Sequence, residues 1–372
     1  YAQFVTNTNY ELRMRSATSG TWQTLVSELI KGSAMHLGNT KFLSWVEGGL
    51  LLGNSDRAAG QASWVGFLDP SQPLPGRQFQ ASVYDPEVNW VNPRWLFWPY
   101  TDSYLSAPGA SDALAISNAT LVSGPSALGP KKHLFISDWS GQTIWQLDGI
   151  DPASVSVSLQ ATAHLVAGKL GEVSSEATLE SSNLASGSVR FNQPEAMLYL
   201  ERSTVPHLLV ADTSNHSIVD LNLASGESRR IIGAAGTFNN QNQTREALAV
   251  DAAAEHGGNV ANIHLNYPHQ LVKAAQSEAL YLGDSDNRLI RCADPYGSGK
   301  AWILAGNPAF TNRPAWKIPV AAIGDGEARQ VFISRPYWLA KDPTGNLFFN
   351  EEQSSRLRKL WSSFLFQERV QP

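Results

Sequence analysis

The feature that most constrains the fold is a signature that recurs six times along the chain. A β-rich run ends in Asp or Asn, a few polar residues follow, and a second alternating run begins, most clearly over residues 207–221 and 280–291. Each copy is typical of a β-hairpin. A side-chain oxygen at the corner can accept backbone N–H groups two residues on and close an Asx turn, so Asp and Asn can interchange. The six corners are Asn7, Asn54, Asp138, Asp212, Asp284 and Asn350.

Two further signals flank these hairpins. Proline opens the apolar run before three of them, and proline suits the first residue of a strand because it lacks an N–H donor. These prolines are Pro194, Pro268 and Pro336. After the hairpin, β-rich runs end in small residues, over 164–168, 230–236 and 302–306. Each repeat therefore contains four antiparallel strands. Six such sheets can bury their faces on one another in a radial arrangement, which predicts an all-β, six-bladed β-propeller.

The same residues resemble the NHL repeat. The resemblance rests on Gly324–Ala328, Ser334–Pro336, Gly345–Asn350 and Arg356–Lys359, and on 191–194 followed by 211–218. It covers roughly residues 133–361 and is fainter over 1–130. The resemblance implies an NHL-like propeller. It leaves the activity open, because propellers of this family include scaffolds, RNA-binding proteins and enzymes.

The corners are 47, 84, 74, 72 and 66 residues apart, more than the forty-odd residues of an ordinary blade. The excess predicts long inter-blade loops such as 171–187 and 239–260, with a short helix over 244–256. Between 69 and 132, three segments are candidate inner strands: 92–98, 112–117 and 125–128. We expect one domain over residues 1–372. Nothing precedes Phe4–Asn7 to form the first strand of its blade, so either upstream sequence is missing, which we favour, or another segment fills that place.

Composition and charge argue against several classes of protein. The net charge is −5 and the basic residues are interspersed with acidic ones, so no nucleic-acid partner is expected. No apolar run reaches the roughly 18 residues that a membrane span needs. The single cysteine, Cys292, forbids an internal disulfide and a cysteine zinc cluster. Three glycosylation sequons, at Asn118, Asn215 and Asn242, favour a secreted or luminal location.

The candidate site consists of the residues that follow the strand-opening prolines, because inner strands of a propeller line its central channel. They are Glu195, His269 and Tyr337, with Arg94 and Ser126 as further members. An acid, an imidazole, a phenol and a guanidinium at a channel mouth could perform acid–base chemistry or hold a metal. The alternative is that they are solvated polar residues without a function.

One blade resembles that of the peptidyl-hydroxyglycine amidating lyase, a zinc enzyme. The resemblance is carried by Tyr267-Pro-His269-Gln-Leu followed by residues 283–290. It implies that His269 is a candidate divalent-metal ligand. The lyase uses three histidines from different blades, whereas this chain has Glu195 and Tyr337 at the equivalent positions. The three-histidine set is therefore not reproduced.

Aromatic residues gather between positions 90 and 100, where Trp90, Trp95 and Trp98 occur. Exposed rings there could stack on a sugar or anchor a protein partner. The alternative is that they fill the space between blades.

The sequence therefore predicts a non-catalytic binding or scaffold propeller that mediates protein–protein interaction, as a subunit of a larger assembly and without a cofactor. One alternative is a metal-assisted lyase or hydrolase that uses Glu195, His269 and Tyr337 at the channel mouth. A second alternative is a glycan-binding module that uses the tryptophans and Arg94.

Overall fold

The computed structural model describes residues 2–4, 11–15, 19–27, 40–46, 49–54, 64–68, 95–97, 116–122, 132–139, 141–150, 163–169, 172–173, 184–234, 258–274, 277–310, 323–354 and 356–361. The chain divides into two compact units, Tyr1–Glu172 and Val173–Pro372. The described helices are single 3₁₀ turns, and none of them is long enough to cross a membrane.

The first unit contains three antiparallel sheets, each formed by strands that are consecutive in the chain. Their strands are β1 (Ala2–Phe4), β2 (Glu11–Arg15) and β3 (Trp22–Ser27); β4 (Thr40–Val46), β5 (Gly49–Asn54), β6 (Trp64–Leu68) and β7 (Trp95–Phe97); and β8 (Ile116–Val122), β9 (Lys132–Asp138), β10 (Thr143–Ile150) and β11 (Ala163–Gly168).

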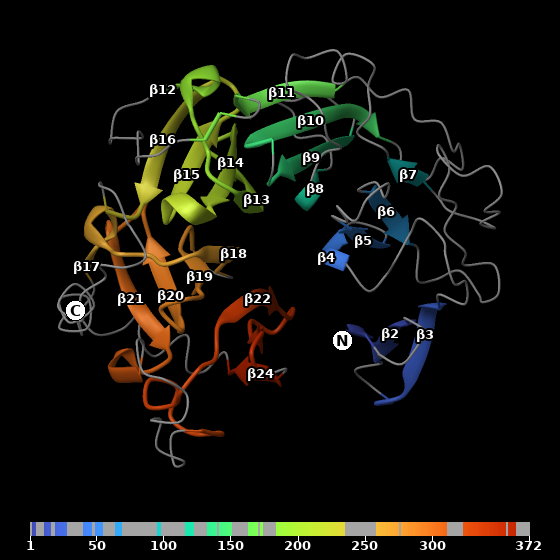
Figure 1. The fold of residues 1–372 in the computed structure, drawn as a ribbon, viewed down its shortest axis with the longest axis vertical. Helices are drawn as coiled ribbons and strands as arrows, with labels where there is room; N and C mark the ends of the chain where they lie inside the picture. The colour runs from blue at the N-terminus through green and yellow to red at the C-terminus, as the bar shows by residue number, and fades with distance from the viewer. Residues whose placement is uncertain are drawn as a thin grey trace. The chain divides into compact units, whose positions relative to one another are not determined.

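The second unit also contains three antiparallel sheets (Figure 1). Their strands are β12 (Leu184–Ala185), β13 (Pro194–Arg202), β14 (Val205–Asp212), β15 (Ser217–Asn222) and β16 (Glu227–Ile232); β17 (Gly258–Asn259), β18 (Pro268–Lys273), β19 (Leu280–Asp284), β20 (Leu289–Asp294) and β21 (Lys300–Ala305); and β22 (Pro336–Lys341), β23 (Leu347–Glu351) and β24 (Arg356–Leu360).

The all-β, antiparallel architecture is confirmed. Four sheets contain the expected run of four consecutive strands, and two of these carry an additional two-residue strand, β12 or β17, beside the fourth. The first and last sheets have three strands among the described residues. The expected helix over 244–256 lies outside those residues.

The stretch between 69 and 132 differs from its prediction. The strand β7 falls within the candidate segment 92–98, but it pairs with β6 and is the fourth strand of its sheet, so its interpretation as an inner strand is wrong. The first strand of the following sheet is β8, which overlaps the candidate 112–117 only at its end. Because β8 opens with Ile116 in place of proline, the signal that marks β13, β18 and β22 is missing. The third candidate, 125–128, lies outside the described residues.

The first strands β13, β18 and β22 lie next to one another in the second unit. One apolar core lies between the sheets of β13 and β18, around Leu209, Ile218 and Leu271, and a second lies between the sheets of β18 and β22. First strands that adjoin while the sheets pack face to face are typical of neighbouring propeller blades.

At the two sheet boundaries of the second unit, a hydroxyl group next to the hairpin corner links one sheet to the next. Thr213 Oγ1 donates to the carbonyl oxygen of Pro268 at 2.8 Å, and Ser285 Oγ donates to that of Pro336 at 2.5 Å. Both contacts are buried. Gly283, directly before the corner Asp284, lies close to the next sheet. A Cβ at this position would be 2.7 Å from the carbonyl oxygen of Pro336, so the position requires glycine.

We expect Thr213→Val to destabilise the fold by about 1 kcal/mol, because a buried carbonyl loses its donor while the side-chain shape is kept. Ser285→Ala should have a similar effect, and the two should add, because each acts at a different sheet boundary. Urea unfolding measures both. The exposed Ser188 makes no side-chain hydrogen bond among the described residues, so Ser188→Ala serves as the control.

The corner acids act differently from the predicted Asx turns. Asp138 binds locally, to the N–H of Gly141 at 2.9 Å. Asp212 and Asp284 instead accept the N–H groups of Asn192 and Asn266, each at 2.7 Å and about twenty residues earlier in the chain. They therefore fasten the entry of the first strand to the corner, and the Asx-turn interpretation is wrong for these two.

The corner of the last sheet is Glu351, one residue after the predicted Asn350. Glu351 pairs with the strand-opening Pro336, as Asp284 pairs with Pro268. It is 2% exposed and accepts from Arg358 at 3.0 Å. Asn350 instead accepts the backbone N–H of Trp338 at 2.6 Å. A longer acid was missed because the pattern was defined by Asp and Asn alone.

Candidate functional site

The backbone at the start of β13, β18 and β22 has the same unusual form in each strand. The residue before the proline has a left-handed φ, at 57° for Gln193, 51° for Tyr267 and 44° for Arg335. The pairing register with the second strand then breaks directly after the proline. A register break releases a residue from the regular alternation of the sheet and re-aims its side chain. The residue after each proline is therefore free to leave the plane of its own sheet.

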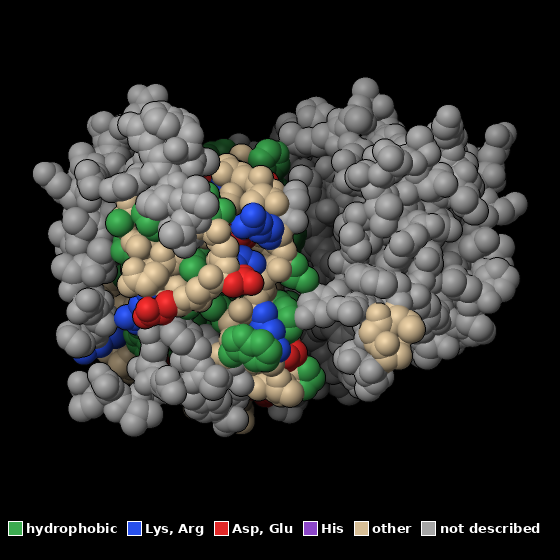
Figure 2. All heavy atoms as spheres, turned by 90° about the horizontal axis from the view of Figure 1, so that it is seen from below, with side chains coloured by type: hydrophobic (Ala, Val, Ile, Leu, Met, Phe, Trp, Pro, Cys, Tyr) green, Lys and Arg blue, Asp and Glu red, His purple; other side chains and the backbone are tan. Residues whose placement is uncertain are grey.

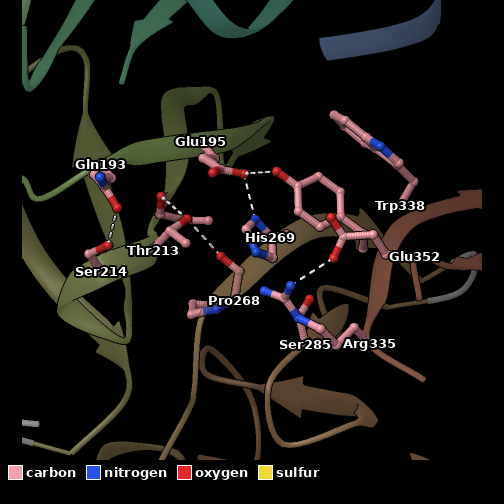
Figure 3. A network of polar contacts seen from close by, with 12 residues as sticks. Gln193, Glu195, Thr213, Ser214, Pro268, His269, Ser285, Arg335, Trp338 and Glu352 are labelled. Atoms are coloured by element: carbon pink, nitrogen blue, oxygen red, sulfur yellow. Dashed lines mark hydrogen bonds and ion pairs between the residues drawn. The ribbon is translucent and has the colours of Figure 1, made fainter. Parts of the chain in front are cut away.

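Three of the predicted site residues come together at this point (Figure 3). The Nδ1 atom of His269 donates to Oε2 of Glu195 at 2.5 Å, and the Tyr337 hydroxyl donates to the same oxygen at 3.0 Å. The His269 and Tyr337 rings are stacked with centroids 3.9 Å apart. The side chains of His269 and Glu195 are 6% and 15% exposed. Arg94 and Ser126 lie outside the described residues, and the inner-strand interpretation that linked Arg94 to this site does not hold.

Burial and charge determine the state of Tyr337. Burial, followed by the charge of Glu195 and its hydrogen bond, raises the pKa of the Tyr337 phenol far above its ordinary value of 10. The phenol therefore remains a donor throughout the physiological pH range, and Glu195 has both of its partners in place.

His269 has one nitrogen left over. Its Nδ1 faces the Glu195 carboxylate, whereas Nε2 is buried and has no hydrogen-bond partner among the described residues. A carboxylate that holds one imidazole nitrogen fixes the ring orientation and leaves the other nitrogen for a ligand, a metal or a proton. Within the cluster, the Nε2 atom of His269 is therefore the group that could still bind a ligand, a metal or a proton.

The described residues do not assemble a metal site around this nitrogen. They contain no group of three or more His, Cys, Asp or Glu side chains placed to hold an ion. A structural or catalytic zinc ion needs three or four protein ligands. Among the described residues the cluster supplies one free imidazole nitrogen, with Glu195 and Tyr337 already bonded to each other.

A rim of ion pairs and aromatic rings lies beside the cluster (Figure 3). Arg335 Nε binds Asp286 Oδ1 at 2.6 Å, and its Nη1 binds Glu352 Oε2 at 2.9 Å. The rings of Tyr337 and Trp338 meet edge to face at 5.3 Å. Arg335 thus joins the corner turns of two neighbouring sheets on the same side as the cluster.

The loop before β18 is held in the same way. The backbone N–H of Tyr267 donates to Nδ1 of His216 at 3.1 Å, and the two rings meet edge to face at 4.9 Å. Burial lowers the pKa of His216 to about 4, so the imidazole stays neutral and can accept this bond. The face at the start of the first strands is therefore fixed by side-chain contacts between sheets.

Sequence reasoning missed Arg335, Trp338 and Glu352. The signal was present in the sequence around the strand-opening Pro336. Arg335 directly precedes this proline, and Trp338 lies two residues after it. Glu352 follows the true corner of the last sheet. The prediction considered only the residue directly after each proline.

The corner acid Asp212 is 1% exposed and forms no ion pair with a described residue. Asp284 and Glu351 each bind an arginine seven residues on, whereas Val219 occupies that position after Asp212. Burial raises the pKa of Asp212 to about 7, although its bonds from Asn192 and Asn215 oppose the rise. Asn215 Nδ2 donates to this carboxyl at 2.8 Å, so the sequon asparagine is part of the corner.

We expect the stability of the wild type, relative to Asp212→Asn, to fall as the pH rises from about 4 to about 7. The folded state binds the Asp212 proton more tightly than the unfolded chain, whose aspartates titrate near their ordinary value of 3.8. The proton-linked stabilisation is therefore complete below pH 4 and lost above pH 7. Urea unfolding of both proteins at several pH values measures the difference. A constant difference between pH 4 and 7 would contradict the raised pKa.

The tryptophan cluster proposed for glycans lies outside the described side chains. The strand β7 contains Trp95, and neither Trp90 nor Trp98 belongs to a described element. The glycan-binding interpretation stays a prediction. Cys292, in contrast, is described, and it is a buried thiol at 3% exposure.

Comparison with known proteins gives fold likeness only. No protein-family model and no curated protein matches the chain. An auxiliary nutrient binding protein from Bacteroides ovatus aligns with TM-score 0.48 and 13% identity, over 96% of this chain and 65% of the other, which is less than two thirds of it. A nidogen/laminin complex structure aligns with TM-score 0.47 and 9% identity, over 96% of this chain and 87% of the other. A putative 6-phosphogluconolactonase from Bacteroides uniformis aligns with TM-score 0.40 and 11% identity, over 94% of this chain and 76% of the other. At these values the likeness assigns no activity.

Proposed function

We propose that the protein is a non-catalytic binding module: one six-bladed, NHL-like propeller over residues 1–372 that presents to a partner protein the face at which β13, β18 and β22 begin. The observation that carries the proposal is the bonding of Glu195 to both His269 and Tyr337. It fixes side chains from three sheets at one point. A surface that is fixed before binding loses little conformational entropy when the partner arrives.

The composition of this face supports a protein partner. Trp338, Tyr267 and Arg335 lie around the cluster, and Trp, Tyr and Arg are the residue types that dominate binding energy in protein interfaces. Arg335 and Glu352 form a half-exposed charged rim next to them. A polar rim around aromatic anchors is the usual anatomy of such interfaces.

We expect Glu195→Gln to weaken partner binding about tenfold or more, because a neutral amide accepts from His269 and Tyr337 less strongly than a carboxylate does and the cluster loses its single geometry. Partners are isolated by co-purification with the full chain from its native source, and dissociation constants are then measured with the purified partner. The control is Glu201→Gln, the same substitution at an exposed position near the other end of β13, which should change binding less than twofold. Equal binding by both variants, or a wild-type chain that retains no partner, would refute the proposal.

The metal-assisted lyase or hydrolase is the second candidate, because Nε2 of His269 is oriented by a carboxylate and lacks a partner among the described residues. Metal analysis of the purified chain separates the two functions. Stoichiometric zinc that disappears in His269→Ala, with Glu201→Gln unaffected, would favour the enzyme. Substoichiometric metal in the wild type would favour the binding module.

A further inference from the structure

A second polar cluster lies at the opposite end of β13 from Glu195. The pairing of β13 to β16 places Arg202, His207, Asp220 and Arg229 on one face of their sheet, because side chains alternate along each strand. This face packs against the sheet of β18, and Tyr296, in the turn after β20, belongs to the contact. The cluster therefore lies at the boundary between two neighbouring sheets.

Both arginines are positioned by the ring of Tyr296. The Cζ atom of Arg202 lies 3.5 Å from the ring centroid, and that of Arg229 lies 5.9 Å from it. The face of an aromatic ring attracts a cation at such distances. Burial, followed by the charge of Asp220, raises the pKa of the Tyr296 phenol far above its ordinary value of 10. The ring therefore holds both guanidinium groups without neutralising either of them.

The two positive charges face a single carboxylate in this contact. Asp220 Oδ1 is bonded to Nδ1 of His207 at 2.7 Å, and Asp220 is 2% exposed. Its other oxygen lies 3.6 Å from Nε of Arg229, which is longer than a hydrogen bond. Among the described residues, Arg202 forms neither a hydrogen bond nor an ion pair. Since a guanidinium has five N–H donors, the cluster has donors and positive charge to spare.

Solvent reaches these donors without any opening of the sheets. The side chain of Arg229 is 44% exposed, and Arg202 and Tyr296 are half-buried. Gly297 and Ser298, which follow Tyr296 in the turn, are exposed. A small ligand can therefore approach the two guanidinium groups from outside.

The size of this cluster indicates the class of ligand. Planar guanidinium groups bind phosphate and carboxylate oxygens in pairs of parallel hydrogen bonds. A polyanion such as nucleic acid needs a broad basic area. On the face shown in Figure 2, the described Lys and Arg side chains lie among Asp and Glu side chains and form no such area. Two arginines on one ring fit a compact oxyanion.

We propose that Arg202 and Arg229, held by Tyr296, form a binding site for the phosphate or carboxylate group of a small ligand. The bound oxyanion accepts from both guanidinium groups and supplies the second negative charge that the cluster lacks. The site is independent of the proposed function, because it lies at the other end of β13 from the face at which the first strands begin.

Titration calorimetry of the full chain tests the site, with inorganic phosphate and succinate as separate probes at an ionic strength fixed with sodium chloride. We expect saturable binding of at least one probe, and the stronger of the two identifies the oxyanion. Arg202→Lys and Arg229→Lys keep the charge but lose the planar fork, so each should weaken binding about tenfold or more. The control Arg356→Lys makes the same change at an exposed position in β24 and should alter binding less than twofold.

Two results would overturn the proposal. Absence of saturable binding of both probes by the wild type would mean that the arginines hold no oxyanion. Equal binding by the two cluster variants and by the control would mean that the anion binds elsewhere on the chain. Thermal unfolding gives a second measurement, because a ligand that binds only the folded state raises Tm. The rise produced by the bound probe should be smaller in Arg202→Lys and Arg229→Lys than in Arg356→Lys, and equal rises would also overturn it.

Discussion

Replacing Arg291 by Met is expected to destabilise the fold by about 3–5 kcal/mol, the loss that follows when one partner of a buried ion pair is removed. Arg291 Nε binds Asp284 Oδ2 at 2.6 Å, with side-chain exposures of 2% and 0%. The same carboxylate accepts from Asn266 and Asn287, which fasten the entry of β18 to its corner. Without the guanidinium, a charge without a counter-ion remains in the sheet interior.

The pH dependence of Arg291→Met identifies the cause. Burial raises the pKa of Asp284, and Arg291 opposes the rise. Without Arg291 the folded-state pKa rises further above the unfolded value, so the variant should regain stability as the pH falls. The double variant Asp284→Asn/Arg291→Met should recover part of the loss, since no charge stays buried. Urea unfolding against pH measures both effects.

An exposed ion pair supplies the control. Lys273 and Glu278 are 2.6 Å apart, but their side chains are 38% and 40% exposed. Lys273→Met should therefore change stability by less than about 1 kcal/mol. A loss for Arg291→Met no larger than this would show that Asp284 is neutral in the wild type.

Replacing Gly306 by Ala is expected to cost about 3 kcal/mol or more, because two penalties combine. Gly306 follows β21 with φ +92°, a conformation that residues with a Cβ rarely adopt. An added Cβ would lie 2.4 Å from the carbonyl oxygen of Arg288 in the hairpin corner. That neighbour is backbone and cannot turn away. Thermal and urea unfolding measure the effect.

Gly299→Ala separates the two penalties. Gly299 also has positive φ, at +66°, but a Cβ there meets nothing within 4 Å. Its replacement should cost about 1–2 kcal/mol, from the conformation alone. If Gly306→Ala cost no more than Gly299→Ala, the close approach of β21 to the corner would be refuted.

The hairpin repeats and the strand-opening prolines were predictable because their causes are local. Alternation of apolar residues, turn residues and the missing N–H of proline each act over a few positions. The same signals identified Glu195, His269 and Tyr337 as the residues after the prolines. They failed at β8, which opens without proline, and at Glu351, where a longer acid takes the corner.

The sequence by itself determined the antiparallel β strands and the residues placed at their entries, since these follow from alternation and turn chemistry along a short stretch. Only the tertiary structure decided which side chains meet. Glu195 is 74 residues from His269 and 142 from Tyr337, and their contact depends on how three sheets pack. It also decided that corner acids bind backbone about twenty residues earlier, because packing, and not proximity in the chain, brings those N–H groups to the carboxylates.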